Sequence, residues 1–250
     1  MNSRDAMSLN PSNRFSPESL AVSSRETAWS REARPAGRAH WSERGLPVFV
    51  QVIQGQVKDA GKTREALDLW ERELAPGADG WLGSTGGVTD DGKFIELVRF
   101  ESEAAARRNS ERPEQDRWWK QTSRLFTGSG ASFKESDEVT VDVVGDPERA
   151  GFVQVIQGQG SDPDRARELM AQDSDEWAAF RPDIVASVAM QHEDGRYTMA
   201  TYFTSEADAR AGELKELPPE LKEQMAEMGA LTVGEPEFLD IKKPWMHSPQ

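Results

Sequence analysis

The sequence has no cysteine and only three histidines, and these shortages exclude several kinds of site. Without cysteine there is no disulfide, thiolate metal site, iron–sulfur cluster or cysteine nucleophile. The histidines, His40, His192 and His247, lie far apart in the sequence and lack the spacing of metal ligands. We therefore expect no metal centre built on several histidines.

Long apolar runs and an excess of positive charge are also missing. No apolar stretch approaches the roughly 18 residues that span a bilayer, and no apolar signal-peptide core follows the first residues. The 30 Lys and Arg are outnumbered by 44 Asp and Glu, and the net charge of −14 would repel a nucleic-acid backbone. These absences predict a soluble, cytoplasmic protein without a membrane or nucleic-acid partner.

Residues 1–47 have little that could form a core. This segment is rich in Arg, Ser and Pro and shows almost no aliphatic periodicity, so burial cannot offset the entropy of ordering it. Its Arg/Ser bias is similar to that of a transit peptide, but its five acidic residues argue against one. We expect a disordered N-terminal tail.

The rest of the chain is a tandem duplication. The octapeptide FVQVIQGQ at residues 49–56 recurs unchanged at residues 152–159, and 22 of the 62 positions aligned without a gap from these points are identical. Two copies are too few for a solenoid, so the chain should contain two related units.

Both copies predict the same order of elements, β-α-β-β-α-β. Apolar, β-branched runs and Gly-containing turns indicate the strands, and Ser102 and Ser205 are the expected N-caps of the second helices. Prolines interrupt these helices at residues 112–113 and 218–219. The expected strands lie at residues 48–53, 81–89, 93–100 and 139–143 in the first copy, and those that open and close the second lie at 152–156 and 237–241.

This order is the split βαβ arrangement, whose sheet carries both helices on one face and leaves the other face bare. Two such units can cover each other's bare face. We therefore predict an α+β fold of two fused ferredoxin-like repeats, residues 48–145 and 151–243, that form a pseudo-dimeric α+β barrel within a monomer. Residues 244–250 form a C-terminal tail that packs back onto the barrel, with His247 exposed.

Several of these motifs together resemble the antibiotic biosynthesis monooxygenase family of dimeric α+β barrel proteins. They are the repeated octapeptide, residues 94–100 leading into Ser-Glu-Ala at 102–104, and Arg-Pro-Glu-Gln at 112–115 followed by Trp118 and Trp119. The resemblance covers about residues 48–243. The family includes cofactor-independent oxygenases of polyketide aromatics, quinol oxygenases, haem-degrading enzymes and proteins without demonstrated activity, so its fold alone does not name a reaction.

The resemblance implies oxygenation of a hydrophobic aromatic or quinol-type molecule by O₂, with no cofactor and no metal. In such enzymes the substrate is deprotonated and its anion supplies the electrons, while the protein provides an apolar pocket and polar groups for the ionised oxygen. The alternative is a non-catalytic small-molecule-binding or structural barrel. Haem is not expected, because no histidine lies on either second helix.

Family pockets lie between the sheet and the second helix, and this implies three catalytic candidates. Arg99 could stabilise an anionic oxygen, Tyr202 could donate a proton or hydrogen bond, and Asn109 precedes the helix break. Structural alternatives stay open: a salt bridge at the sheet margin for Arg99, and a core position for Tyr202 with its hydroxyl reaching solvent.

Substrate-binding candidates come from the strands and the helix after the break: Gln51, Ser84, Trp118, Trp119, Gln154 and Ser187. Strand alternation places Gln51 and Gln54 on opposite faces, so at least one Gln of each copy should be buried. A glutamine satisfied by the backbone and tryptophans in an ordinary core are the alternatives. If one half keeps a working pocket, we expect the first, because it holds Asn109 and the tandem tryptophans.

Overall fold

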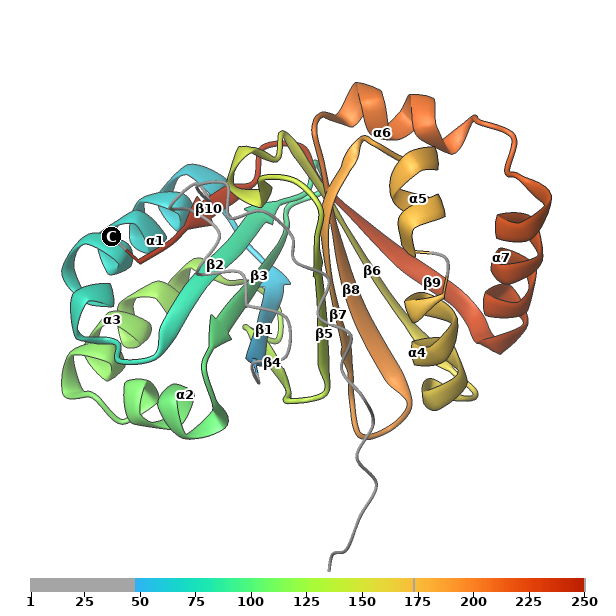
Figure 1. The fold of residues 1–250 in the computed structure, drawn as a ribbon. Helices are drawn as coiled ribbons and strands as arrows, with labels where there is room; N and C mark the ends of the chain where they lie inside the picture. The colour runs from blue at the N-terminus through green and yellow to red at the C-terminus, as the bar shows by residue number, and fades with distance from the viewer. Residues whose placement is uncertain (1–47, 173, 250) are drawn as a thin grey trace, which may run out of the picture. The chain divides into compact units, whose positions relative to one another are not determined.

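The computed structural model describes residues 48–172 and 174–249, which form two five-stranded antiparallel sheets with helices beside each (Figure 1). The predicted disorder of residues 1–47 lies outside the described residues. The two sheets confirm the predicted α+β class and the fusion of two βαββαβ repeats.

The first repeat follows the predicted order. Its elements are β1 (Phe49–Gln56), α1 (Ala60–Glu73), η2 (Ala75–Gly77), β2 (Trp81–Val88), β3 (Lys93–Phe100), α2 (Glu103–Ser110), α3 (Pro113–Thr122), η3 (Ser123–Leu125) and β4 (Ser132–Ser136). Ser102 caps α2 as predicted, and its hydroxyl accepts from the backbone N–H of Ala105 at 3.2 Å. Pro113 begins α3, where its missing N–H costs nothing, and so separates the two helices.

The second repeat has the same order with a different helical layer. Its elements are β6 (Phe152–Gly160), α4 (Pro163–Ala171), α5 (Ser174–Phe180), β7 (Ile184–Gln191), β8 (Arg196–Phe203), α6 (Glu206–Glu213), α7 (Pro219–Leu231) and β9 (Thr232–Ile241). Ser205 caps α6 by accepting from the backbone N–H of Asp208 at 3.1 Å, which confirms the second predicted N-cap.

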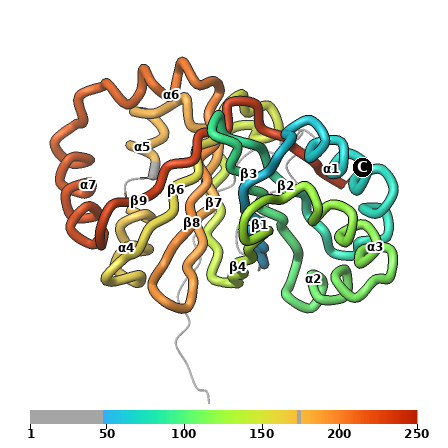
Figure 2. The backbone as a smooth tube through the Cα atoms, turned by 180° about the vertical axis from the view of Figure 1, so that it is seen from behind, coloured from blue at the N-terminus to red at the C-terminus, as the bar shows by residue number. Residues whose placement is uncertain are grey.

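Each repeat also contributes one strand to the sheet of the other. Strand β5 (Val139–Val143) follows β4 but pairs with β7 in the second sheet, and β10 (Trp245–His247) follows β9 but pairs with β2 in the first. Figure 2 shows this end of the chain beside β2. The strand orders are β10-β2-β3-β1-β4 and β5-β7-β8-β6-β9.

This exchange corrects one detail of the sequence prediction. Residues 139–143 form a strand as predicted, but they do not close the first repeat; the strand beside β1 is β4. Strand β4, with the sequence SFKES, has a single apolar residue and therefore gives no strand-like apolar run. It is recognisable only through its pairing with β1.

The inner faces of the two sheets bury each other, which confirms the predicted pseudo-dimeric barrel. One apolar core joins residues of both repeats: Val50, Val52, Ile95 and Leu97 from the first, and Val153, Val155, Val188, Ala200, Leu239 and Ile241 from the second. These side chains alternate along their strands with residues that face the helices.

The outer faces carry the helices. In the first repeat, Trp70 of α1, Trp81 of β2 and Phe100 of β3 share a core with the alanines of α2. In the second repeat, the buried cluster on this face is smaller and holds Phe152, Phe203 and Ala209. None of the helices in the described part of the chain is long and apolar enough to cross a membrane.

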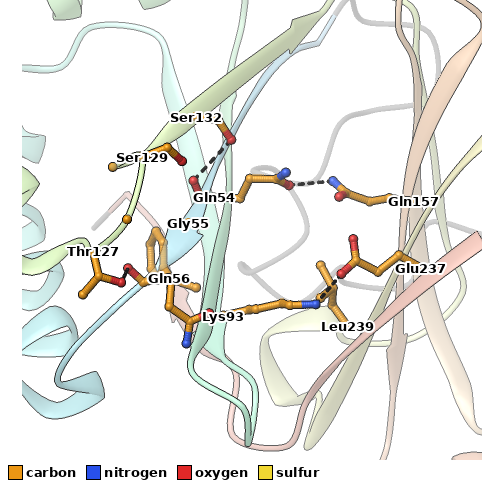
Figure 3. A pocket seen from close by; sticks show the side chains of 13 residues that line it. Gln54, Gly55, Gln56, Lys93, Thr127, Ser129, Ser132, Gln157, Glu237 and Leu239 are labelled. Atoms are coloured by element: carbon orange, nitrogen blue, oxygen red, sulfur yellow. Dashed lines mark hydrogen bonds and ion pairs between the residues drawn. The ribbon is translucent and has the colours of Figure 1, made fainter.

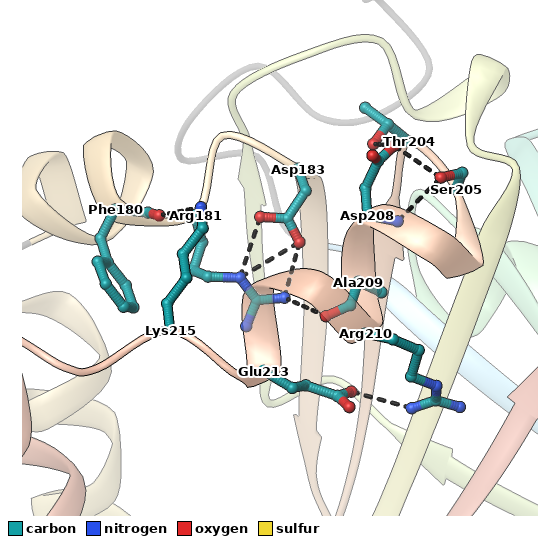
Figure 4. Close-up of polar contacts among 10 residues, drawn as sticks. All are labelled: Phe180, Arg181, Asp183, Thr204, Ser205, Asp208, Ala209, Arg210, Glu213 and Lys215. Carbon is teal, nitrogen blue, oxygen red and sulfur yellow. Dashed lines mark hydrogen bonds and ion pairs between the residues drawn. The ribbon is translucent and has the colours of Figure 1, made fainter.

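A buried ion pair fastens α6 of the second repeat to its sheet (Figure 4). The guanidinium of Arg181 donates to the carboxylate of Asp183 at 2.7 Å and to the backbone carbonyl of Ala209 in α6 at 3.3 Å. The central guanidinium carbon of Arg181 lies 5.6 Å from the ring centre of Phe203. Because both charged groups are almost fully buried and paired, removing either would leave an uncompensated charge.

Candidate functional site

Both repeats contribute to a cavity of about 320 Å³ (Figure 3). Its lining includes Gln54 and Lys93 of the first repeat, Gln157, Glu237 and Leu239 of the second, and the loop at residues 127–130.

The repeated octapeptide places equivalent glutamines of the two repeats, Gln54 and Gln157, in this cavity, and Gln56 of the first repeat also lines it. Val50 and Val52 are buried between the sheets, so Gln54, two residues further along β1, lies on the same inner face. The same alternation from Val153 and Val155 brings Gln157 to the inner face of β6.

These two glutamines are hydrogen-bonded to each other across the inter-sheet space. Nε2 of Gln157 donates to Oε1 of Gln54 at 2.9 Å and to the hydroxyl of Thr198 at 3.1 Å. Gln157 is 8% exposed and Thr198 is fully buried. The amide of Gln157 is therefore held from two sides.

An ion pair lies at a second point of the lining. Nζ of Lys93 donates to Oε1 of Glu237 at 2.6 Å, and both side chains are about half exposed. The hydrogen bond and the charge of Glu237 raise the pKa of Lys93, so its ammonium stays protonated. The cavity thus holds an ammonium–carboxylate pair as well as the amides of Gln54 and Gln157.

Gly55 explains how the loop at residues 127–130 approaches the sheet. A Cβ at this position would come 2.7 Å from the carbonyl oxygen of Gly130 and 2.7 Å from the ring of Phe126. The equivalent Gly158 is covered by Tyr197, whose hydroxyl would lie 2.6 Å from a Cβ. Both repeats thus use glycine to admit an aromatic ring against the strand.

A second hollow, of about 270 Å³, lies beside α2, near the predicted family pocket. Its lining includes Phe49, Gln51, Arg107 and Glu135. Nε2 of Gln51 donates to Oε1 of Glu135 on the neighbouring strand at 2.7 Å. Deeper between this sheet and its helices, Trp70, Trp81 and Phe100 fill the space.

Of the three predicted catalytic residues, Arg99 and Tyr202 are buried close enough to interact electrostatically, and Asn109 lies in the helical layer. Tyr202 is fully buried between the sheets and donates to the hydroxyl of Thr85 at 3.0 Å, so its hydroxyl does not reach solvent. Arg99 is also buried, and burial lowers the pKa of its guanidinium. Electrostatic interactions with Tyr202 and Glu148 act in the opposite direction and raise this pKa. Asn109 lies in α2, where its Oδ1 accepts from Nη1 of Arg112 at 3.0 Å.

The predicted substrate-binding residues are distributed over both repeats. Gln154 donates to Asp240 at 2.9 Å, and this contact repeats the pairing of Gln51 with Glu135. Ser187 lies on β7 opposite Asp142 and Thr201.

The two tryptophans belong to the helical layer of the first repeat. Nε1 of Trp118 donates to the carbonyl of Ala66 at 3.0 Å, and the ring of Trp119 packs against Phe126 and Phe133.

None of the nine predicted site residues lines the inter-sheet cavity, and Gln51 lines the hollow beside α2.

Ser84 belongs to a buried polar cluster under α1. His247 of β10 is 6% exposed, so its predicted exposure is wrong; its Nε2 lies 3.0 Å from Oδ1 of Asp68, and its Nδ1 lies 3.5 Å from the hydroxyl of Ser84. Glu96 is also buried here. Burial raises the pKa of Glu96, against the charge of His247 and a hydrogen bond from Ser84, which lower it.

The sequence contained a signal for the cavity. Gln54 and Gln157 repeat at equivalent positions, and their alternation with valine already placed them on the face opposite Gln51 and Gln154. Lys93, Thr198 and Glu237 could be found only once the strands were paired across the two repeats. In the described residues, no group of three or more His, Asp or Glu is arranged to hold a metal ion.

Comparison with known proteins shows what this architecture is similar to. No family model matches the sequence, and no curated protein matches it at the sequence level. Among solved structures, a candidate monooxygenase of Lactobacillus acidophilus superposes with a TM-score of 0.64 at 11% identity, over 81% of this chain and 96% of that one.

Two further structures superpose over similar lengths. A candidate monooxygenase of Fusobacterium nucleatum gives a TM-score of 0.64 at 9% identity, over 82% of this chain and 95% of that one. An anthrone oxidase-like protein gives a TM-score of 0.61 at 12% identity, over 82% of this chain and 94% of that one.

The chain shares its fold with these three proteins. This confirms the resemblance predicted from the sequence, and it holds for both repeats because each superposition covers more than four fifths of the chain. At these identities the likeness concerns the fold, and a monooxygenase-like barrel can carry different activities.

Proposed function

We propose that this monooxygenase-like barrel binds a hydroxylated aromatic or quinol-type molecule in the inter-sheet cavity and oxygenates it with O₂, without a bound cofactor. The observation that supports this most is the pair of central amides, Gln54 and Gln157, next to the ammonium of Lys93. Amide and ammonium groups together suit an oxygen that changes from a hydroxyl to an anion.

Lys93 is the group proposed to stabilise the anion. It remains protonated beside Glu237, and its charge would lower the cost of ionising a substrate hydroxyl within the cavity. Glu237 is the proposed proton acceptor, since it is a carboxylate in the lining and is itself half exposed. Substrate entry would then separate the two side chains and place the reacting oxygen between them.

The apolar part of the lining suits an aromatic ring. Leu239 of the inter-sheet core lines the cavity, and Phe94 borders it with its ring packed on the helical side against Phe126 and Trp245. For an anthrone-like substrate the reaction balances as follows: the activated CH₂ carbon becomes a carbonyl with one atom of O₂, and the second atom leaves as water with the two hydrogens. The substrate supplies all the electrons, so no external reductant is needed.

A non-catalytic binding barrel is the second candidate function. It is favoured by the aromatic side chains that fill the sheet–helix space of the first repeat, where the family pocket was expected, and by the closed Lys93–Glu237 pair. Such a protein would keep the amides as a binding site and lack turnover.

Oxygen uptake with anthrone separates the two functions. The oxygenase proposal expects uptake that saturates with anthrone and falls at least tenfold in Lys93→Met and in Glu237→Gln. Lys62→Met, which removes an exposed lysine of α1, serves as the matched control and keeps full uptake. Absence of uptake, together with saturable quenching of tryptophan fluorescence by anthrone, would support the binding barrel, because Trp245 lies beside Phe94.

A further inference from the structure

The two central glutamines are equivalent in sequence but not in their hydrogen bonds. Both hydrogens of the Gln157 amide are used, one on Oε1 of Gln54 and one on the hydroxyl of Thr198. Within the described residues, neither Oε1 of Gln157 nor Nε2 of Gln54 takes part in a hydrogen bond, although both residues line the cavity (Figure 3). The pair therefore offers the cavity one acceptor and one donor.

Thr198 determines this orientation. Its hydroxyl oxygen accepts from Gln157, and its own hydrogen can be donated to Nε2 of His192, which lies 3.0 Å away. Valine, in contrast, could neither accept from Gln157 nor donate to His192.

His192 completes the chain of contacts as a hydrogen-bond acceptor, which requires its neutral form with the proton on Nδ1. Burial lowers the pKa of His192, and the positive charges of Lys134 in β4 and Arg196 in β8 lower it further. A hydrogen bond with the backbone at Glu135 and the charge of Asp194 raise it. At neutral pH the ring is therefore uncharged and can accept from Thr198.

We infer that His192 and Thr198 are positioning residues that hold Gln157 with its carbonyl toward the cavity, and that the cavity selects a ring carrying a hydrogen-bond donor beside an acceptor. The ligand donor meets Oε1 of Gln157, and the ligand acceptor meets Nε2 of Gln54. A cyclic amide and a hydroxyl next to a carbonyl share this chemistry. The inference rests on the cavity being the binding site of the proposed function, but not on the oxygenation step.

Protonation of His192 reverses the pattern. Nε2 then becomes a donor, the hydroxyl of Thr198 accepts from it, and the hydroxyl hydrogen has to find another acceptor. The carbonyl of Gln157 becomes that acceptor if its amide turns over; its NH₂ group then faces the cavity, and its Oε1 opposes Oε1 of Gln54, so the hydrogen bond that orients the pair is broken. Selection for a ligand donor is therefore lost as the pH falls through the pKa of His192.

The test is calorimetric binding of two matched probes to the full chain. 2-Quinolinone carries an N–H donor beside a carbonyl, and N-methyl-2-quinolinone lacks the donor. The wild-type chain is expected to prefer 2-quinolinone at least about fivefold at pH 8, since N-methyl-2-quinolinone leaves Oε1 of Gln157 without a donor. The preference should fall below threefold once the pH is low enough to protonate His192, whose pKa burial lowers below its ordinary value of 6.5.

Variants separate positioning from simple loss of structure. Thr198→Val and His192→Leu are expected to reduce the preference below threefold at pH 8, and Thr198→Val should also abolish its change with pH. Thr198→Ser keeps the hydroxyl and should retain both the preference for 2-quinolinone and its change with pH. Thr201→Val, on the same strand but the opposite face of the sheet, should behave as wild type.

Three results would overturn the positioning of Gln157 by Thr198 and His192. They are equal binding of the two probes by the wild-type chain, binding of neither probe, and an unchanged preference in Thr198→Val. Oxygen uptake with anthrone is measured separately. A chain that prefers 2-quinolinone yet shows no uptake retains the positioning role and contradicts the oxygenase alone.

Discussion

Gln54 and Gln157, which are 103 positions apart in the sequence, meet through a hydrogen bond of 2.9 Å between their side-chain amides. They hold the same place in the two repeats, so their contact marks the point where the repeats are related to each other by approximate twofold symmetry. Equivalent residues that meet in this way are typical of an interface between identical surfaces. The two repeats thus meet within one chain in the way that two identical subunits meet at a twofold interface.

Gly55→Ala is expected to destabilise the chain by about 1–3 kcal/mol, because the added methyl group overpacks the contact with the backbone of Gly130 and the ring of Phe126. Gly229→Ala in α7 is the control. Apart from its chain neighbours and the helix's own backbone, no atom lies within 4 Å of its added Cβ, and alanine favours the helix by up to about 1 kcal/mol. Urea unfolding of both variants checks this, and equal stability of the two would contradict the packing described for Gly55.

Glu96→Gln is expected to stabilise the chain increasingly as the pH rises. Because burial raises the pKa of Glu96 above its unfolded value of 4.5, the folded chain binds this proton more tightly than the unfolded chain does. The contribution of Glu96 to stability is therefore complete below pH 4.5 and is lost as the pH rises through the folded pKa. Glutamine stays neutral and avoids this loss.

Urea unfolding at pH 5 and pH 8 measures the effect of Glu96→Gln. We expect a gain of about 1–3 kcal/mol at pH 8 and a smaller one at pH 5. Glu220→Gln, at an exposed position of α7, should change stability little at either pH. A gain for Glu96→Gln that is identical at both pH values would contradict the buried, protonatable state of this side chain.

Trp245→Ala tests the strand that the second repeat returns to the first sheet. Trp245 is 7% exposed, and its ring lies 6.3 Å from that of Phe94, so its loss is expected to cost about 3–5 kcal/mol in the free energy of unfolding. Phe238→Ala removes an aromatic side chain that is 56% exposed and should cost much less. Similar unfolding midpoints for the two variants would show that β10 is not docked as described.

The fold was largely predictable because it follows from periodicity and repetition. The octapeptide, the hairpin turns and the caps Ser102 and Ser205 identified most elements, and the bare inner face of each repeat required a partner sheet. Strand β4 was missed, since an edge strand with one apolar residue has no sequence signature. The exchange of β5 and β10 depends on tertiary pairing and could not be read from local patterns.

The site was less predictable than the fold. Gln51 and Gln54 belong to one strand, and alternation could separate their faces but could not say which face encloses a cavity. The choice of Gln51 and Gln154 followed the family pocket near the second helix, whereas the inter-sheet cavity holds Gln54 and Gln157. Lys93 and Glu237 lie in different repeats, and only their packing in space brings them together.

The most direct test of the central claim, that the inner faces of the two repeats cover each other, uses the absence of cysteine from the sequence. Lys93→Cys and Glu237→Cys are combined in one chain, treated with a short bis-maleimide, and analysed for cross-linking by peptide mass spectrometry, with each single variant as control. We predict an efficient intramolecular link between positions 93 and 237, because the native side chains meet at 2.6 Å. Free thiols capped separately, or links formed only between different molecules, would contradict the account.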